Sequence, residues 1–243
     1  MSEALPKGPG EPVPFDQILV GDTETTGLRP FGLLDDGTPS GDPEGPDRLC
    51  SAALIRVLRS GGGVWIPVEK IVLVIDPQRT VPEVASAVNG FVRIAKGPAA
   101  IRGRRNLAGL PTFAAIGPFL RKTIGSLPLA FHNAAFDAAV LDAEFIRAGL
   151  PLLDGPILCT KKAFSDVMGK GRPDAYVKGT NLNALCDRLG VDRSGRIGPD
   201  GKELHGAEVD ALMAAACLTP LDAAGQMIPE RPEQLPHRRR IAG

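Results

Sequence analysis

The sequence predicts one α/β domain built on a mixed five-stranded sheet, with helices on both faces. Three strand patterns come first with no long helical pattern between them, so they should pair as an antiparallel meander. Two later strand patterns alternate with helical segments, an arrangement that adds parallel strands to a sheet. The chain has 243 residues, 43% of them hydrophobic, which is enough to bury a substantial core.

The order of the elements follows from periodicity and from turn residues. The first three strands are expected at 16–23, 48–58 and 63–76, with a glycine-rich turn at 60–63. Two more strands are expected at 127–131 and 156–159, and helices at 81–88, 111–124 with a kink at Pro118, 134–149, 160–168, 181–189 and 206–218. The Pro-rich ends predict flexible tails at 1–14 and 221–243 around a domain at 15–220.

Composition excludes several classes of protein. Cations and acids both number 28, so no overall field attracts nucleic acid and any site for a polyanion must be local. The first residues lack a signal-peptide pattern, and the apolar run 71–75 is too short to cross a bilayer. We therefore expect a cytoplasmic protein without a membrane partner. The cysteines form no Cys-x-x-Cys pair, which favours four reduced thiols in the core: Cys50, Cys159, Cys186 and Cys217.

The first strand ends in two acids, within the segment QILVGDTETTG at 17–27. Side chains alternate along a strand, so Asp22 and Glu24 share the face of Ile18 and Val20. Like charges side by side repel each other. A compensating cation is therefore expected beside them.

Two later helices each carry an acid on the stripe that should face the core. Asp137 recurs with Leu141 and Phe145 at i, i+4 and i+8. Asp210 occupies the same kind of position in the last predicted helix. An ionised carboxylate in a dry interior is costly unless a cation compensates it.

Four inward-facing carboxylates from three elements predict a site for two hard divalent cations, Mg²⁺ or Mn²⁺. Two such ions are suited to phosphodiester hydrolysis. The Asp-x-Glu spacing alone is a weak signal, because Asp142 and Glu144 repeat it on a helix, where residues i and i+2 point in different directions.

Three segments carry a family resemblance: GDTETTGL (21–28), AFHNAAFDAAVLDAEF (130–145) and LHGAEVDALMAA (204–215). In this order they resemble the motifs of the DnaQ-like, DEDD-type 3′–5′ exonucleases. The histidine subclass (DEDDh), typified by the proofreading epsilon subunit of bacterial DNA polymerase III, is the most similar. The resemblance covers about residues 16–220 and implies a ribonuclease H-like fold.

The resemblance also implies roles for single residues. The metal ligands would be Asp22, Glu24, Asp137 and Asp210, and His205 would be the general base. His205 precedes Gly206 at a helix start, where a histidine can take a proton from water beside the cluster or can simply cap the helix.

Further residues are candidates for contacts with the substrate: Thr25, Gly27, Leu28, Asn89, Asn133 and Phe136. In the family, residues matching Thr25 and Gly27 approach the 3′ end closely, and the one matching Leu28 is an apolar wedge between the last two bases. Phe136 could stack on a base or only pack in the core. Asn89 departs from the family, which often has histidine there.

We expect a metal-dependent exonuclease acting on a single-stranded or frayed 3′ end, of DNA rather than RNA, in proofreading or end-trimming, alone or with a DNA polymerase. Two alternatives stay open: the same chemistry on RNA 3′ ends, and a non-catalytic subunit that binds a polymerase or nucleic acid. The complete set of site residues argues against the second. The insertions 29–46, 92–110 and 192–203 could select partners or substrates, or could be filler.

Overall fold

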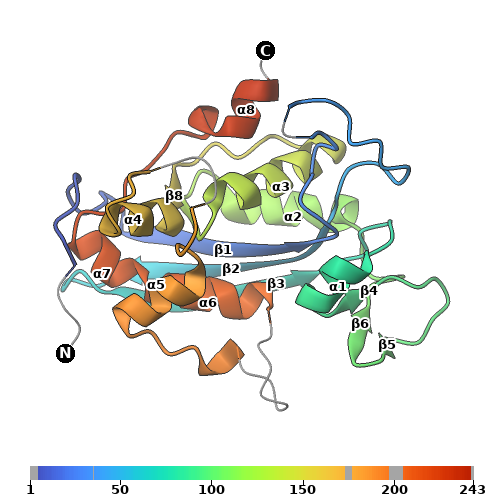
Figure 1. The fold of residues 1–243 in the computed structure, drawn as a ribbon, viewed down its shortest axis with the longest axis horizontal. Helices are drawn as coiled ribbons and strands as arrows, with labels where there is room; N and C mark the ends of the chain where they lie inside the picture. The colour runs from blue at the N-terminus through green and yellow to red at the C-terminus, as the bar shows by residue number, and fades with distance from the viewer. Residues whose placement is uncertain (1–4, 35, 173–176, 197–204, 242–243) are drawn as a thin grey trace.

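The computed structural model describes residues 5–34, 36–172, 177–196 and 205–241. Its central sheet has five strands in the order β3-β2-β1-β7-β8 (Figure 1). The meander consists of β1 (Gln17–Thr25), β2 (Leu49–Arg59) and β3 (Trp65–Val74), paired antiparallel. The strands β7 (Leu129–Phe131) and β8 (Ile157–Cys159) run parallel to β1. The predicted mixed sheet is confirmed.

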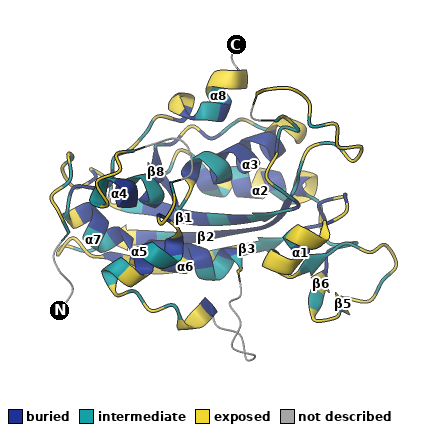
Figure 2. Cartoon of the chain, in the orientation of Figure 1, coloured by how far each residue is buried: buried dark blue, intermediate teal, exposed yellow. Residues whose placement is uncertain are grey.

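Helices cover both faces of the sheet. One layer contains α2 (Phe113–Ile124), α3 (Ala134–Arg147) and, outside α3, the short C-terminal α8 (Pro236–Ile241) (Figure 1). The other layer contains α4 (Thr160–Val167), α5 (Leu182–Leu189), α6 (Ala207–Ala216) and α7 (Leu218–Ala223). Figure 2 shows the buried positions concentrated where these two layers meet the sheet.

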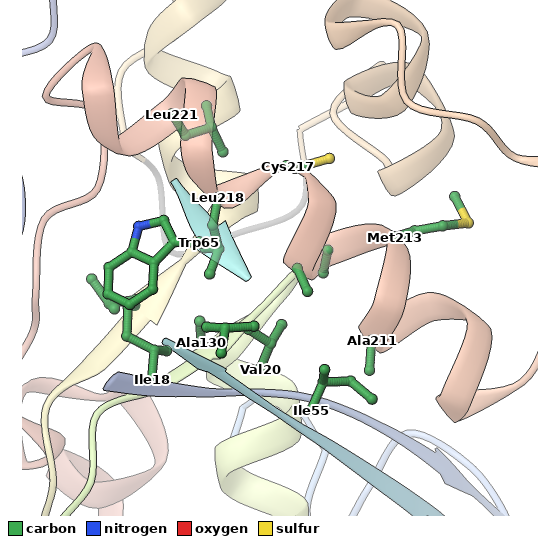
Figure 3. Close-up of a cluster of buried hydrophobic side chains, with 14 of the residues drawn as sticks. Ile18, Val20, Ile55, Trp65, Ala130, Ala211, Met213, Cys217, Leu218 and Leu221 are labelled. Atoms are coloured by element: carbon green, nitrogen blue, oxygen red, sulfur yellow. The ribbon is translucent and has the colours of Figure 1, made fainter. Parts of the chain in front are cut away.

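The alternation of β1 supplies both hydrophobic cores. Ile18 and Val20 point into the cluster under α6 and α7, where Figure 3 shows them facing Ala211 and Leu218. Leu19 points into the cluster under α2 and α3. On this second face, a Cβ added to Gly21 would lie 2.4 Å from the ring of Phe131, so only glycine allows this close contact next to Asp22.

The insertion expected at 92–110 contains a small three-stranded sheet beside α1 (Glu83–Asn89). Its strands are β4 (Phe91–Val92), β5 (Ala100–Ile101) and β6 (Arg104–Asn106), in the order β4-β6-β5. The amide of Asn106 bonds the carbonyl oxygens of Ile94 and Pro98, each at 3.0 Å, and thereby closes the loop between the strands.

The loop inserted at 29–46 is held against the domain by one buried side chain. Arg79 donates to the carbonyl oxygens of Gly45 and Pro46 and to the carboxylate of Asp42. Of the insertion at 192–203, the structure describes the 3-10 turn η1 (Ser194–Arg196) and its approach, whereas 197–204 lie outside the described residues.

Both ends of the described chain pack on the domain, which differs from the flexible tails expected from the sequence. Val13 is buried, and its backbone N–H donates to Asp222 Oδ1 at 2.7 Å. Near the other end, η2 (Pro232–Gln234) leads into α8, and Leu235 is buried against the α3 layer. The buried carboxylates that accept hydrogen bonds from these segments could not be recognised from the sequence as the groups that hold the chain ends.

All four cysteines are buried and unbridged, as expected. Among the residues that the structure describes, no helix is both long and apolar enough to span a membrane.

Candidate active site

Three carboxylates converge at the end of β1. Asp22 and Glu24 come from the strand, and Asp210 comes from the first turn of α6, which packs on β1 and β2. One oxygen from each of the three lies within 4.8 Å of the others. The side-chain alternation predicted for β1 and the buried stripe predicted for α6 therefore place these acids together.

The fourth predicted acid reaches the same place from the opposite face of the sheet. Asp137 lies in the first turn of α3, and its Oδ1 accepts a hydrogen bond of 2.8 Å from the hydroxyl of Thr23. Thr23 stands between the two acids of β1 and so points to the other face. Asp137 lies outside the group of three oxygens but lines the same hollow.

The strand changes register just after the acids. The pairing of β1 with β2 shifts between Glu24 and Thr25, an irregularity that bends a strand and redirects its side chains. Asn89 Nδ2 donates to the carbonyl oxygen of Thr25 at 3.0 Å, and Asn89 Oδ1 accepts from the backbone of Phe91. The end of β1 is thus tied to α1 and the small sheet.

A hollow of about 520 Å³ opens over the carboxylates. Of the residues that the structure describes, fifteen line it: Asp22, Thr23, Glu24, Val88, His132, Asn133, Phe136, Asp137, Lys161, Asn181, Leu182, Asn183, Arg196, His205 and Asp210. All five predicted catalytic residues are among them. The hollow is large enough to hold a nucleotide beside the carboxylates.

Burial and mutual repulsion oppose ionisation of the acids. The pKa of Asp22 is raised well above its ordinary value, first by burial and then by the charges of Asp137 and Asp210. Burial, with the charge of Asp210, raises the pKa of Glu24 to about 7. Burial also raises the pKa of Asp137 to about 7, although the bond from Thr23 acts in the other direction. Such raised pKa values are typical of functional carboxylates.

One cation already lies in the cluster. Arg196 is buried at the end of η1, and its guanidinium donates to both oxygens of Asp210, with Nε 2.6 Å from Oδ1. A third bond joins Arg196 to Asn183 Oδ1 at 2.5 Å. Burial alone would raise the pKa of Asp210, but His205 and Arg196 outweigh it and hold that pKa below its ordinary value.

His205 lies at the rim of the hollow, just before α6. Its Nδ1 is 3.7 Å from Asp210 Oδ2, and its side chain is 39% exposed. At this exposure the imidazole can exchange protons with solvent. The part of the insertion leading into His205 lies outside the described residues.

The structure adds residues that the sequence did not indicate. His132 is held between Thr160 Oγ1 at 2.9 Å and the carbonyl oxygen of Thr180 at 3.0 Å, and burial lowers its pKa to about 4. A neutral His132 can therefore form part of the wall of the hollow. Arg196 also lines it. His132 lies within the second motif, and this position was the one sequence feature that could have indicated it as a site residue. Arg196 lies in a loop, where no periodicity marks the residues that face a site.

The predicted substrate contacts divide into two groups. Asn133 and Phe136 line the hollow, whereas Leu28 is 80% exposed and lies in a neighbouring hollow. Thr25, Gly27 and Asn89 line neither hollow, and the side-chain amide of Asn89 forms hydrogen bonds with backbone groups. Their substrate roles stay predictions.

The donor set of the cluster fits hard divalent cations. All four acids offer carboxylate oxygens, which Mg²⁺ and Mn²⁺ favour, and no cysteine contributes a sulfur donor to the described lining. The acids that would hold such ions are Asp22, Glu24 and Asp210, with Asp137 beside them.

Metal binding should depend steeply on pH. Protonated carboxyls bind cations poorly, so with pKa values of about 7 for Glu24 and Asp137 the affinity should fall below pH 7. We expect a loss of about tenfold per pH unit for each carboxyl that must release a proton. Mn²⁺ titrations by calorimetry at about pH 6, 7 and 8 would measure it, and Asp137→Asn should make the dependence shallower. Equal affinity at all three values would contradict the assignment.

Arg196 should compete with cations for Asp210. Arg196→Gln removes a unit positive charge beside a ligand, and we expect Mn²⁺ affinity to rise by about tenfold. Arg193→Gln is the matched control, because Arg193 belongs to the same segment but pairs with Asp187 at 2.9 Å outside the hollow. A lower affinity in Arg196→Gln would mean instead that Arg196 holds Asp210 in position for the metal.

Comparison with known proteins gives relatives in sequence and in fold. No family model matches the chain. The DNA polymerase III subunit epsilon of Pasteurella multocida (strain Pm70) is 29% identical over 202 residues, which are 83% of the chain and 66% of that relative. The chain thus spans just under two thirds of the length of this relative.

Two solved structures share the fold. The nuclease domain of 3'hExo, a DEDDh family member bound to rAMP, matches with a TM-score of 0.61 and 12% identity, over 90% of the chain and 98% of the domain. Exonuclease X in complex with 5' overhanging duplex DNA matches with a TM-score of 0.51 and 20% identity, over 91% and 98%. The similarity to the epsilon subunit extends over most of the same residues, so the chain resembles DnaQ-like exonucleases in sequence and shares the fold of solved exonuclease structures.

Proposed function

We propose that the chain is a metal-dependent 3′–5′ exonuclease that removes nucleotides from DNA 3′ ends, using two Mg²⁺ or Mn²⁺ ions. The observation that carries the proposal is the group of three carboxylate oxygens within 4.8 Å, with His205 at its rim. Burial and then the charges of the neighbouring acids raise the pKa of Asp22 and of Glu24, so the arrangement favours a state with bound cations.

The residues of the site have separate tasks in this reaction. Asp22, Glu24 and Asp210, with Asp137 beside them, would hold the two ions, which when bound favour attack by water and stabilise the leaving oxygen. His205 accepts the proton of the attacking water at its imidazole. The oxygen of that water bonds to phosphorus as the bond from phosphorus to the 3′ oxygen of the preceding nucleotide breaks. The departing 3′ oxygen takes a proton from solvent water, and a nucleoside 5′-monophosphate leaves.

Residues on the α3 side orient the end of the strand. Phe136 lies in the first turn of α3, one residue before Asp137, and its ring lines the hollow, where a terminal base could stack on it. Asn133 and Lys161 are 3.2 Å apart through Oδ1 and Nζ at the same wall. Together they offer an amide and a cation to the phosphate of the last nucleotide.

DNA is the substrate that we favour, because the relative from Pasteurella multocida is named as a subunit of a DNA polymerase. A polymerase partner and a role in proofreading or end-trimming are proposals that follow from the same name. The cytoplasmic location expected from the sequence also stays a proposal. RNA is the second candidate. One observation favours it: the related fold of 3'hExo is bound to rAMP.

The reaction should require metal and should begin at the 3′ end. The assay uses single-stranded DNA and RNA of identical sequence, each labelled at the 5′ end, with Mg²⁺, Mn²⁺ or EDTA. We expect ladders that shorten from the 3′ end, a faster rate on DNA, and no product in EDTA. Cleavage that survives EDTA or proceeds from the 5′ end would contradict the proposal. A faster rate on RNA would mean that RNA, and not DNA, is the substrate.

His205→Ala should separate the base from the metal ligands. If His205 accepts the proton but does not hold metal, the variant should bind Mn²⁺ with unchanged or slightly raised affinity while kcat falls by about 10²–10⁴. Asp210→Ala should lose metal binding as well. The checks are calorimetry and single-turnover rates on one preparation of each variant.

A structural role for His205 predicts a different pattern. If the residue only supports the start of α6, His205→Ala should melt at a lower temperature yet turn over at nearly the normal rate per folded molecule. Measuring Tm alongside the rate distinguishes the two, and a destabilised but active variant would rule out the general-base role.

A further inference from the structure

A second hollow of about 540 Å³ lies next to the candidate active site. Its walls are the loop after β1, the start of α3 and the C-terminal helix α8, with these lining residues: Leu28, Arg29, Pro30, Phe31, Leu33, Asn133, Ala135, Phe136, Ala139, Lys161, Pro236, His237, Arg240 and Ile241. Asn133, Phe136 and Lys161 line both hollows. The two hollows therefore share a wall.

A buried carboxylate fixes α8 in place as one wall of this hollow. Asp142 on α3 accepts from His237 Nε2 at 2.8 Å and from Arg238 Nε at 2.7 Å, and its Oδ1 accepts from the backbone of Leu153. Asp142 has no exposed surface. Breaking such a buried pair by removing one partner is costly, so α8 is a firmly held part of the domain.

The chemistry of the second hollow suits a nucleic-acid strand. Among the residues that the structure describes, the charged side chains that line it are the cations of Arg29, Lys161 and Arg240, with no acid. Phe31 offers an aromatic surface and stacks on His237 with the ring centroids 5.8 Å apart. Cations beside aromatic rings are the usual means of binding single strands.

One buried polar atom in the wall also lacks a partner. His237 is 8% exposed and lines the hollow, yet its Nδ1 makes no hydrogen bond to any described residue. Buried polar atoms are rarely left without a partner, since this costs free energy.

We propose that the second hollow binds the nucleic-acid strand upstream of its 3′-terminal nucleotide, and that α8 supplies the outer wall with Arg240 contacting a backbone phosphate. The inference rests on the proposed function, because the strand must have its 3′ end in the first hollow. A strand leaving that end crosses the shared wall at Phe136 and meets Phe31 and the three cations. The C-terminal segment is thus a substrate-binding element of this chain.

The test compares two neighbouring arginines on α8. Both Arg239 and Arg240 are exposed, but only Arg240 lines the hollow. Binding of fluorescein-labelled oligo(dT) of about twelve nucleotides is measured by anisotropy in EDTA at several salt concentrations, and dTMP competition measures binding of a single nucleotide. Hydrolysis of the same oligonucleotide with Mn²⁺ is followed on the same preparations.

For Arg240→Ala we expect about three- to tenfold weaker binding of the oligonucleotide and unchanged competition by dTMP. The slope of the logarithm of the binding constant against the logarithm of the salt concentration should be smaller in magnitude by about 0.7, as the loss of one phosphate contact predicts. Arg239→Ala should keep the slope of the wild type. Equal losses in both variants, or no loss in Arg240→Ala, would overturn the inference and leave the second hollow for another occupant such as a peptide.

The two proposals fail in different ways. If the wild type degrades the oligonucleotide but Arg240→Ala binds it normally, the role of α8 is wrong and the proposed function stands. If the wild type shows no hydrolysis with Mn²⁺ or Mg²⁺, the proposed function is wrong, whatever the binding results. Loss of dTMP competition in Arg240→Ala would place Arg240 at the terminal nucleotide and would also overturn the inference.

Discussion

The structure depends on one electrostatic constraint, the crowding of four carboxylates at the end of β1. The carboxylates of Asp22 and Glu24 accept no hydrogen bond from any described residue, although both lie against other acids. Repulsion at such distances is strong where protein excludes water. The surroundings relieve it only in part, through Arg196 on Asp210 and the hydroxyl of Thr23 on Asp137. The remaining unbalanced charge is what a divalent cation would neutralise.

The two-layer fold is what allows this crowding. Side chains alternate along β1, so its last residues face the α6 layer and the α3 layer in turn, and each layer contributes one acid from the first turn of a helix. The N-terminal ends of helices favour negative charge, which offsets part of the repulsion. Gly21 allows the strand to lie close to Phe131 at this point, because a Cβ there would clash with the ring.

The repeat of hydrophobic side chains along strands and helices was enough to predict the sheet, the main helices and the four inward-facing acids. The strands of the meander and the stripes that hold Asp137 and Asp210 are set by local alternation and by i, i+4 spacing, both of which are visible in one sequence. The small sheet at 91–106, the anchored ends and Arg196 were not predictable in this way. They depend on single long-range bonds, such as that from Val13 to Asp222, which leave no repeating pattern.

The acids outside the site explain why carboxylate spacing alone is a poor guide to function. Asp142 and Glu144 repeat the spacing of Asp22 and Glu24, yet each is matched by an arginine and a backbone N–H. Although burial acts to raise it, the pKa of Asp142 is lowered by its bonds to His237, Arg238 and Leu153, whereas the pKa of Asp22 and of Glu24 is raised. Structural acids are compensated within the protein, and their ionised form stabilises the fold. The acids at the end of β1 are left short of partners, and this difference, rather than the motif, marks them as a site for a cation from outside the chain.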